Sequence, residues 1–204
     1  MNSKKILCID LDDTIALTSN TIIKFAVDFD KKVLKRNGEL KNIDNCKDYY
    51  YFAKMLGWNK EQLTQFFDNC YLKYLKEIRV KPEASSALKK IKALGISIYI
   101  VTSRREKENG KVTKITKKWL KQNNIIYDKL FINAINKWNI IKQVKPSYFL
   151  DDSFENCLNV SKVSKNTEVI LMTTTFNKKI QNEQFRQISN LNELYDIIVR
   201  NENE

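Results

Sequence analysis

Short apolar runs alternate along the chain with longer stretches in which apolar residues recur every three or four positions. The short runs, rich in β-branched residues, indicate buried strands, and the longer spacing indicates amphipathic helices. Strands are expected at 6–9, 96–101, 130–132, 148–150 and 168–172. Helices are expected at 18–38, 49–56, 59–74, 80–95, 112–123, 136–144, from 154 and from 190. Because strands and helices alternate, we expect an α/β fold with a parallel sheet and right-handed crossovers.

Local signals give several of these helices their ends. Gly38, Gly57 and Gly95 stand where helices are expected to stop, and Pro82 suits a first helical turn. Side chains suited to capping a helix N-terminus stand at Asn59, Asn136 and Asn190, the last with Glu193 placed for a capping box.

Residues 17–79 contain helical patterns and no clear strand, and they follow the first expected strand directly. We therefore expect a core domain built from residues 1–16 and 80–204, interrupted by a small helical insertion at 17–79. A chain of 204 residues is long enough for this arrangement. The aromatic run Tyr49–Phe52 lies in the insertion, where it either lines a substrate pocket or, as is more common at helical spacing, forms core.

The composition removes several classes of chemistry. The chain has no histidine, which excludes Ser-His-Asp and Cys-His catalysis and histidine-bound zinc. The four cysteines, Cys8, Cys46, Cys70 and Cys157, are scattered, so they indicate neither a zinc cluster nor a disulfide framework. No stretch is typical of a membrane span or signal peptide. We expect a cytoplasmic protein with reduced, mostly buried thiols.

The chain carries a net charge of +12, which has two interpretations. A functional one is attraction to an anion such as a nucleotide, a sugar phosphate or nucleic acid. The other is compositional bias, because the chain is rich in Lys, Asn and Ile and poor in Gly and Pro. The lysines are spread along the chain without a basic arm, which favours the compositional interpretation.

Polar side chains follow three of the expected strands at the point where each strand ends. They are Asp10, Asp12 and Asp13 after the first strand, Thr102 and Ser103 after the second, and Asp151 and Asp152 after the fourth. In a parallel sheet these ends lie along one edge, which is where ligands bind in α/β proteins. Lys137 opens the helix before the fourth strand, although Lys142 is nearby. Carboxylates with a free backbone carbonyl suit a hard cation such as Mg²⁺.

Ordinary structural explanations stand beside each of these residues. An Asp-rich turn, a strand end at Thr102 and a helix cap at Asp151 and Asp152 require no chemistry. Arg104 and Arg105 either contact a substrate anion or are simply solvated.

Together, however, the motifs resemble those of the haloacid dehalogenase (HAD) superfamily, which consists mostly of phosphatases. The sequence Asp10-Leu11-Asp12-Asp13-Thr14 is similar to the Asp-x-Asp-x-Thr signature, and it is followed in family order by Thr102, Lys137 and the Asp151-Asp152 pair. The resemblance covers essentially the whole chain. It implies a HAD-like Rossmannoid core of three layers, with the helical insertion in the position of a C1 cap.

The resemblance also implies a role for each residue. Asp10 corresponds to a nucleophile that forms an aspartyl phosphate, and Asp12 to a general acid and base. Thr102 and Ser103 correspond to phosphate-binding hydroxyls, and Lys137 to the cation that neutralises the phosphoryl group. Mg²⁺ is implied at Asp10, the backbone carbonyl of Asp12 and the Asp151–Asp152 pair. We place the direct contact on Asp152, with Asp151 second.

The size of the insertion resembles that of the 5'(3')-deoxyribonucleotidase branch and its bacterial and phage relatives, as do the segments Ile100–Arg104, Thr116–Leu120 and Phe149–Ser153. The resemblance implies a Mg²⁺-dependent phosphomonoesterase acting on nucleoside monophosphates, as a monomer or homodimer without a membrane partner. The alternatives are a phosphatase of a sugar phosphate, another metabolite or a nucleic-acid 3'-phosphate end. An alternative of another class is a non-catalytic protein that binds nucleotides or nucleic acid.

Overall fold

The computed structural model describes residues 5–42, 51–107, 109–178, 180 and 183–203. Contacts between residues divide the chain into two compact units. Unit 1 consists of Met1–Ala16 and Val80–Glu204, and unit 2 consists of Leu17–Arg79. The chain therefore leaves unit 1 soon after its first strand and returns once.

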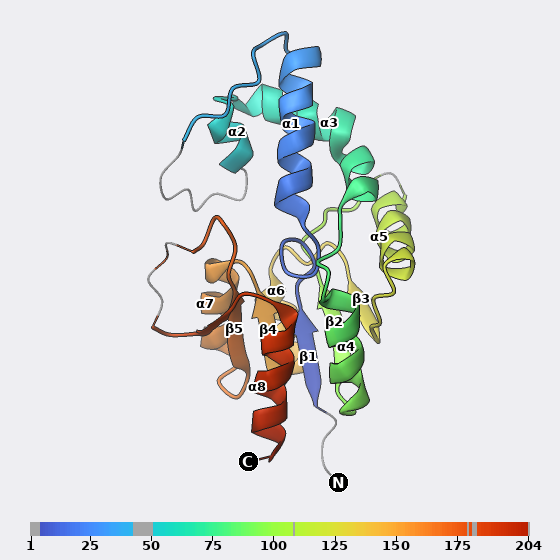
Figure 1. The fold of residues 1–204 in the computed structure, drawn as a ribbon, viewed down its shortest axis with the longest axis vertical. Coiled ribbons are helices and arrows are strands. Elements are labelled where there is room, and N and C mark those ends of the chain that lie inside the picture. The colour runs from blue at the N-terminus through green and yellow to red at the C-terminus, as the bar shows by residue number, and fades with distance from the viewer. Residues whose placement is uncertain (1–4, 43–50, 108, 179, 181–182, 204) are drawn as a thin grey trace. The chain divides into compact units, whose positions relative to one another are not determined.

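Unit 1 is built on a six-stranded sheet in which every strand pair is parallel (Figure 1). The strands are β1 (Ile6–Ile9), β2 (Ser97–Val101), β3 (Lys129–Phe131), β4 (Tyr148–Asp151), β5 (Glu168–Met172) and β6 (Arg186–Ile188). Their order across the sheet is β3-β2-β1-β4-β5-β6. The parallel α/β architecture expected from the sequence is confirmed, whereas the short strand β6 was not predicted.

The centre of this sheet is the place where the strand order reverses. β1 pairs with β2 on one side and with β4 on the other. The chain continues from β2 towards β3 at one edge and from β4 towards β6 at the other. In open α/β sheets the carboxyl ends of strands at such a reversal form the ligand-binding crevice. The ends of β1, β2 and β4 therefore meet where a site is expected.

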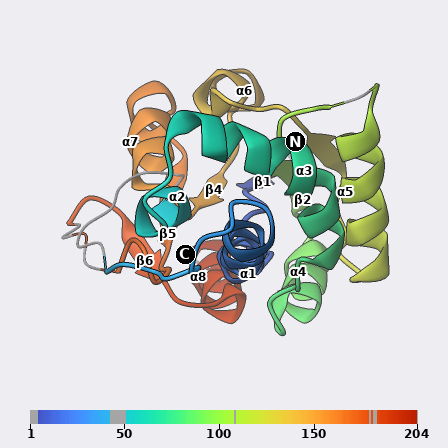
Figure 2. The same cartoon turned by 90° about the horizontal axis from the view of Figure 1, so that it is seen from above.

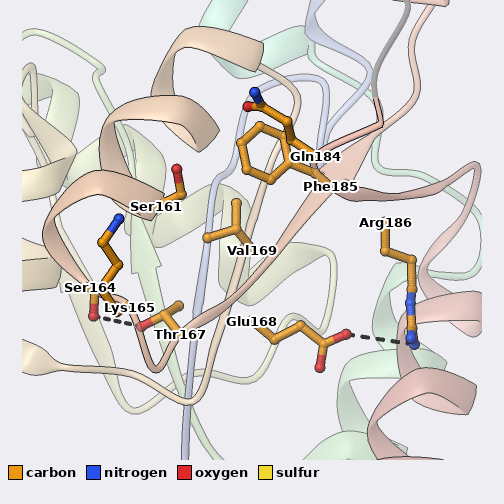
Figure 3. Close-up of a pocket in the computed structure, with 9 residues that line it drawn as sticks. All are labelled: Ser161, Ser164, Lys165, Thr167, Glu168, Val169, Gln184, Phe185 and Arg186. Carbon is orange, nitrogen blue, oxygen red and sulfur yellow. Dashed lines mark hydrogen bonds and ion pairs between the residues drawn. The ribbon is translucent and has the colours of Figure 1, made fainter.

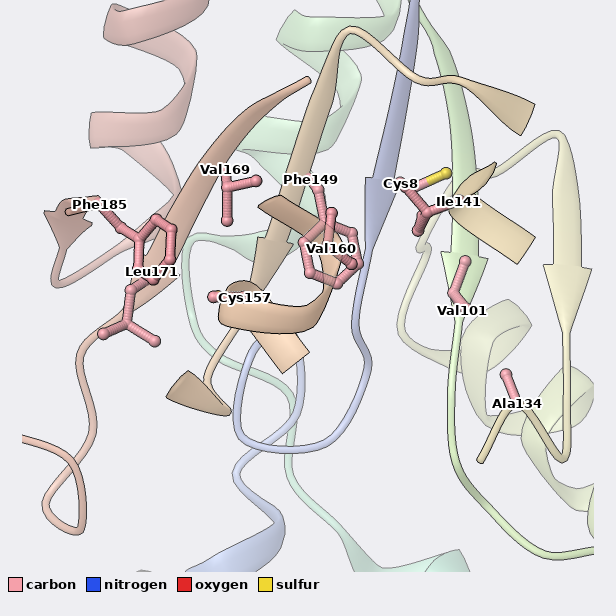
Figure 4. Packing of buried hydrophobic residues seen from close by; sticks show 10 residues of the cluster. All are labelled: Cys8, Val101, Ala134, Ile141, Phe149, Cys157, Val160, Val169, Leu171 and Phe185. Carbon is pink, nitrogen blue, oxygen red and sulfur yellow. The ribbon is translucent and has the colours of Figure 1, made fainter. Parts of the chain in front are cut away.

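One face of the sheet carries a row of apolar side chains in register across four strands. Cys8 of β1 lies opposite Tyr99 of β2 and Phe149 of β4, and Phe149 lies opposite Val169 of β5. Ile141, Cys157 and Val160, from two helices, cover this row, as Figure 4 shows. Since side chains alternate along a strand, Leu7, Ile9 and Leu150 occupy the opposite face and are also fully buried.

Helices cover both faces of the sheet and make a three-layer unit. Those of unit 1 are α4 (Ala84–Ala93), α5 (Lys111–Gln122), α6 (Lys137–Val144), α7 (Phe154–Val163) and α8 (Leu191–Asn203). Seen along the strands, α4 and α8 pack together on one face, and α6 and α7 pack together on the other (Figure 2). The expected helices are therefore present, with ends shifted by one or a few residues.

The expected helix at 80–95 is an exception, because its start was predicted wrongly. Val80 instead forms an antiparallel bridge with Ala16, and the N–H of Lys81 donates to Ile15 O at 2.9 Å. The residue before a proline is disfavoured in helical conformation, so Lys81 stays extended and Pro82 opens a turn rather than the helix. The helix then begins at Ala84.

Unit 2 contains the helices α1 (Thr18–Lys32), α2 (Tyr51–Met55) and α3 (Lys60–Glu77), with α1 packed against the other two. The cap expected at Asn59 is present and forms a capping box that was not predicted, since its side chain accepts from the N–H of Gln62 and the Gln62 side chain accepts from the N–H of Asn59. The expected continuation of α1 to residue 38 is wrong, because the helix ends at Lys32 and Val33 is exposed.

Aromatic rings form the interior of unit 2. Phe66 is fully buried and lies within 6.2 Å, centroid to centroid, of the rings of five neighbours. These neighbours are Phe29, Phe52, Trp58, Phe67 and Tyr74. Tyr51 and Phe52 are buried, which supports the core interpretation of the aromatic run. Tyr49 and Tyr50, which complete that run, lie outside the described residues.

A buried carboxylate explains why α1 stops early. Asp30 is 1% exposed and accepts from Trp58 Nε1 at 2.6 Å and from the N–H of Gly38 at 2.9 Å. Arg36 Nε lies 3.5 Å from the same carboxylate. Gly38 has a φ of 70°, which glycine adopts without strain and which lets the chain fold back towards the helix.

Asp30→Ala is expected to lower the free energy of unfolding by about 2–3 kcal/mol, because it removes buried hydrogen bonds to a charged acceptor. Urea denaturation followed by tryptophan fluorescence and circular dichroism measures this loss. The matched control is Asp28→Ala on the same helix, where an exposed pair with Lys32 at 3.1 Å contributes at most about 0.5 kcal/mol. Equal losses in both variants would contradict a stabilising role for Asp30.

Three cysteines can be placed. Cys8 and Cys157 are buried, Cys70 is half-buried, and all three are free thiols. Cys46 lies outside the described residues. Within the described part of the chain, no helix combines the length and apolar character needed to cross a bilayer.

Candidate active site

The turn after β1 presents the first acidic residues. The N–H of Asp10 donates to Leu150 O at 2.9 Å, which extends the sheet one residue beyond β1. The N–H groups of Ile15 and Ala16 then both donate to Leu11 O, closing a tight turn. Asp13 lies in this turn with a φ of 59°, a left-handed conformation that Asp tolerates better than most residues. The chain therefore reverses directly after Asp10.

Three carboxylates converge at the ends of β1 and β4. One oxygen from each of Asp10, Asp151 and Asp152 lies within 4.8 Å of the others. The Lys137 ammonium lies between two of them, donating to Asp10 Oδ1 and, at 2.7 Å, to Asp151 Oδ2. Asp10, Lys137 and Asp151 are each less than 5% exposed. Residues far apart in the sequence thus form one buried charged cluster.

The two acids at the end of β4 differ in their hydrogen bonds. Asp151 Oδ1 accepts from the N–H of Ser153 at 2.9 Å, and Asn156 Nδ2 lies 3.2 Å from both oxygens of the same carboxylate. Both Asp151 oxygens are therefore already engaged. No hydrogen bond or ion pair to the carboxylate of Asp152 is present among the described residues, and its backbone carbonyl accepts from Asn177 Nδ2 at 2.7 Å. Asp152 is thus the acid with free oxygens.

Burial and the crowding of charges together shift the pKa values of these groups. Burial raises the pKa of Asp10 to about 7, and Asp151 and Asp12 add to the rise while Lys137 opposes it. Burial, followed by the charges of Asp151, Asp10 and Asp13, raises the pKa of Asp152 well above its usual range. Burial alone would lower the pKa of Lys137, but the carboxylates of Asp10 and Asp151 raise it, so the amine stays charged.

The Asp12 carboxylate accepts hydrogen bonds from residues that follow β2. Its Oδ1 accepts from Arg104 Nη2 at 2.8 Å, and its Oδ2 accepts from Arg104 Nε at 3.0 Å. Thr102 Oγ1 also donates to Asp12 Oδ2, at 3.3 Å. The end of β2 therefore holds the Asp12 side chain, while the ends of β1 and β4 hold the cluster.

Other expected and unexpected residues surround these groups. Ser103 Oγ donates to Ala134 O at 3.1 Å, so its hydroxyl is used within the loop after β3. Arg104 is 3% exposed, so the solvated interpretation of this residue was wrong. Lys81 is 9% exposed, and burial lowers its pKa while Glu83, Asp13 and Asp152 raise it.

Sequence reasoning missed Asn156 and Lys81. Asn156 follows three residues after the cap Ser153, whose Oγ accepts from the Asn156 N–H at 3.3 Å, so it lies beside the end of β4. A polar residue in the first turn after Asp151-Asp152 is a signal that could have identified it. Lys81 carries no such signal, because nothing in the sequence distinguishes it from the many other lysines.

The acidic cluster fits a magnesium ion by its chemistry. Carboxylate oxygens are the ligands that Mg²⁺ prefers. The cluster places three acids against one lysine, so bound positive charge would offset the repulsion that adds to the effect of burial on the pKa of Asp10 and Asp152. Asp152, with free oxygens, and Asp10, beside it, are the side chains best placed to bind the ion.

A separate surface pocket of about 340 Å³ lies near the amino end of β5 (Figure 3). It is lined by residues of α7, β5 and β6 and of the segments that precede the two strands, and Glu168 and Arg186 form an ion pair there at 3.6 Å. Because Glu168 begins β5 whereas the carboxylates stand at the carboxyl ends of the strands, this pocket is not part of the charged cluster.

Comparison with known proteins gives consistent results. The family model of the 5'-nucleotidases matches residues 11–175. A curated nucleotidase from Clostridium acetobutylicum is 27% identical over 195 residues, covering 95% of this chain and 93% of the relative.

Solved structures share the fold. A haloacid dehalogenase-like hydrolase from Streptococcus pneumoniae superposes with a TM-score of 0.66 at 14% identity, covering 97% of this chain and all of that one. A HAD hydrolase from Bacillus subtilis, solved bound to magnesium, gives a TM-score of 0.59 at 14% identity, with 97% and 99% coverage. The HAD-like architecture expected from the motifs is confirmed.

Proposed function

We propose, from the premise that this chain belongs to the 5'-nucleotidase family, that it is a magnesium-dependent phosphomonoesterase acting on nucleoside monophosphates. The observation that carries the proposal is the convergence of Asp10, Asp151 and Asp152 around the Lys137 ammonium. The similarity to a curated nucleotidase over nearly the whole chain supports the substrate class.

In the proposed reaction Asp10 attacks phosphorus, and the bond from phosphorus to the leaving alcohol breaks. Asp12 gives its proton to the leaving oxygen and then takes a proton from the water that opens the aspartyl phosphate. Lys137 stays charged and neutralises the carboxylate and the phosphoryl oxygens. The hydroxyls of Thr102 and Ser103, which donate to Asp12 Oδ2 and Ala134 O, turn towards those oxygens when substrate binds. Unit 2 acts as the substrate-selecting cap.

Mg²⁺ would be held by Asp10, Asp152 and the backbone carbonyl of Asp12, and when bound it offsets the repulsion between a carboxylate nucleophile and an anionic ester. The Bacillus subtilis hydrolase with this fold was solved bound to magnesium, which supports that choice. Asp151 is assigned to orienting Lys137 rather than to the ion, because both of its oxygens already accept hydrogen bonds.

Turnover assays test the function directly. Release of inorganic phosphate from the nucleoside 5'- and 3'-monophosphates should exceed release from sugar phosphates and from 3'-phosphorylated oligonucleotides, and EDTA should abolish it. Faster turnover of the oligonucleotides would contradict the proposed substrate class and indicate that the substrate is a nucleic-acid 3'-phosphate end. No metal-dependent turnover, together with salt-sensitive binding of nucleic acid, would instead favour a protein that only binds.

Magnesium is also expected to stabilise the folded protein. With EDTA-treated protein, adding Mg²⁺ at about 100 times its Kd should raise the free energy of unfolding by about 2.7 kcal/mol, because only the folded chain assembles the cluster. Thermal denaturation with increasing Mg²⁺ measures the shift. Asp152→Asn should lose most of it, whereas Glu155→Gln, an exposed neighbour on α7, should keep it. Equal responses in both variants would place the ion elsewhere.

A further inference from the structure

The guanidinium of Arg104 donates to both oxygens of the Asp12 carboxylate. Its Nη2 donates to Asp12 Oδ1 at 2.8 Å and its Nε donates to Asp12 Oδ2 at 3.0 Å. Such a two-pronged pairing fixes the orientation of a carboxylate as well as its position. The Arg104 side chain is only 2% exposed, so water competes little for these hydrogen bonds.

A helix fixes Arg104 in turn. The third guanidinium nitrogen, Nη1, donates to Thr116 Oγ1 at 3.1 Å, and Thr116 is fully buried on α5. The guanidinium carbon lies 6.0 Å from the ring centroid of Trp119, one turn further along the same helix. Two side chains of α5 therefore limit where the guanidinium can lie.

Glu106, two residues after Arg104, binds the start of α5. The Glu106 carboxylate accepts from the N–H of Val112 at 2.8 Å and from the N–H of Thr113 at 3.2 Å. Glu106 thus satisfies N–H groups that a helix N-terminus leaves without partners inside the helix. Arg104, Glu106 and α5 form one connected segment, and the Asp12 carboxylate lies at its end.

The burial of the Arg104 guanidinium calls for an explanation in terms of the site. A buried guanidinium is costly unless it is paired, and a well-packed apolar side chain could take the same space. The N–H groups of the Arg104 guanidinium donate to Asp12 and Thr116. Arg104 is therefore neither solvated nor free to bind a substrate anion.

We propose that Arg104 is a positioning residue that orients the Asp12 carboxyl group for proton transfer, with Thr116 and Trp119 of α5 holding the guanidinium in place. The proposal rests on the proposed function. In the step concerned, the bond between Asp10 and phosphorus forms, the bond to the leaving oxygen breaks, and the Asp12 proton moves to that oxygen. Arg104 itself neither gains nor loses a proton and does not touch the substrate.

The test compares two leaving groups in single-turnover reactions with enzyme in excess, so that only the first chemical step is observed. A nucleoside 5'-monophosphate releases an alcohol that must be protonated, whereas p-nitrophenyl phosphate releases a stable anion that needs no proton. Arg104→Ala, Arg104→Lys and Thr116→Val are compared with wild type. The matched control is Lys114→Ala, which removes an exposed cation on α5.

Positioning predicts that Arg104→Ala slows nucleoside release at least about 30-fold and p-nitrophenolate release less than about threefold, since misplacing a general acid costs about 10²-fold. The rate of nucleoside release by Arg104→Lys should fall by a similar factor, because an ammonium cannot donate to both carboxylate oxygens in the geometry of a guanidinium. Thr116→Val should show the same selectivity at about three- to tenfold. Added guanidinium should restore nucleoside release in Arg104→Ala without changing p-nitrophenolate release, and Lys114→Ala should match wild type.

Two outcomes would overturn the inference while leaving the proposed function intact. One is an equal loss with both substrates and no rescue by guanidinium, which indicates damage to the fold. The other is wild-type nucleoside release in Arg104→Lys and Thr116→Val. If wild type itself turns over neither ester with Mg²⁺, the proposed function fails, and this inference fails with it.

Discussion

Replacing Asp10 by asparagine is expected to lower phosphomonoester hydrolysis by at least about 10⁴-fold, because the amide keeps the size of the carboxylate and loses its nucleophilicity. Steady-state release of phosphate from a nucleoside monophosphate with Mg²⁺ measures the loss. Asp196→Asn, at an exposed position on α8, is the matched control and should retain wild-type activity.

The same variant is expected to become more stable in EDTA, which separates lost chemistry from lost folding. The pKa of Asp10 rises from 3.8 to about 7 on folding, chiefly through burial. A group whose pKa is raised by folding binds its proton more tightly in the folded chain, so ionising it between these pH values costs stability. Asp10→Asn removes that cost at pH 8. A destabilised Asp10→Asn protein, or one with more than a hundredth of wild-type turnover, would contradict the assignment.

Lys137→Met is expected to show the second largest effect, with a fall in kcat of about 10²–10³-fold. The ammonium contacts both Asp10 and Asp151, and its removal leaves buried acids without a neutralising partner. The free energy of unfolding in EDTA should therefore fall by about 3–5 kcal/mol at neutral pH. Kinetics with saturating Mg²⁺ and urea denaturation measure the two effects.

A neighbouring lysine and a double variant make this prediction specific. Lys142→Met on the same helix removes an exposed ammonium and should change neither quantity appreciably. Adding Asp10→Asn to Lys137→Met should recover part of the lost stability, because one of the uncompensated charges is gone, and should recover no activity. If Lys142→Met is the more damaging change, the family position of the lysine has been assigned to the wrong residue.

Local sequence signals determine most of the elements of unit 1. The apolar runs at β1, β2, β4 and β5 are short and end in polar residues, which is why their positions could be predicted within a residue. The strand β6 could not, because Arg186 and Gln187 are exposed and only Ile188 faces the interior, leaving no apolar run. Its place is set by pairing with β5.

The missed helix ends have tertiary causes. The start of α4 depends on pairing between Val80 and Ala16, which lie 64 positions apart, so the helical pattern beginning at residue 80 was misleading. The end of α1 depends on Asp30 binding the N–H of Gly38 and the indole of Trp58. Periodicity does not report contacts of either kind.

The candidate site, too, could be predicted from the sequence only in part. Strand ends and motif order predict which residues gather, and Asp10, Lys137, Asp151 and Asp152 do lie together. They do not predict how hydrogen bonds distribute among those residues. That Asp151 is saturated by Ser153 and Asn156, and that Arg104 holds Asp12, depends on side-chain geometry that sequence spacing leaves open.

Trapping the covalent enzyme tests the central claim most directly. Wild-type protein is mixed with Mg²⁺ and a nucleoside monophosphate, quenched in acid within one turnover and treated with borohydride, which reduces an acyl phosphate to an alcohol. Peptide mass spectrometry should then find homoserine at position 10 and aspartate at position 12. Reduction at another residue, or no reduction at any time that resolves a single turnover, would contradict Asp10 as the nucleophile.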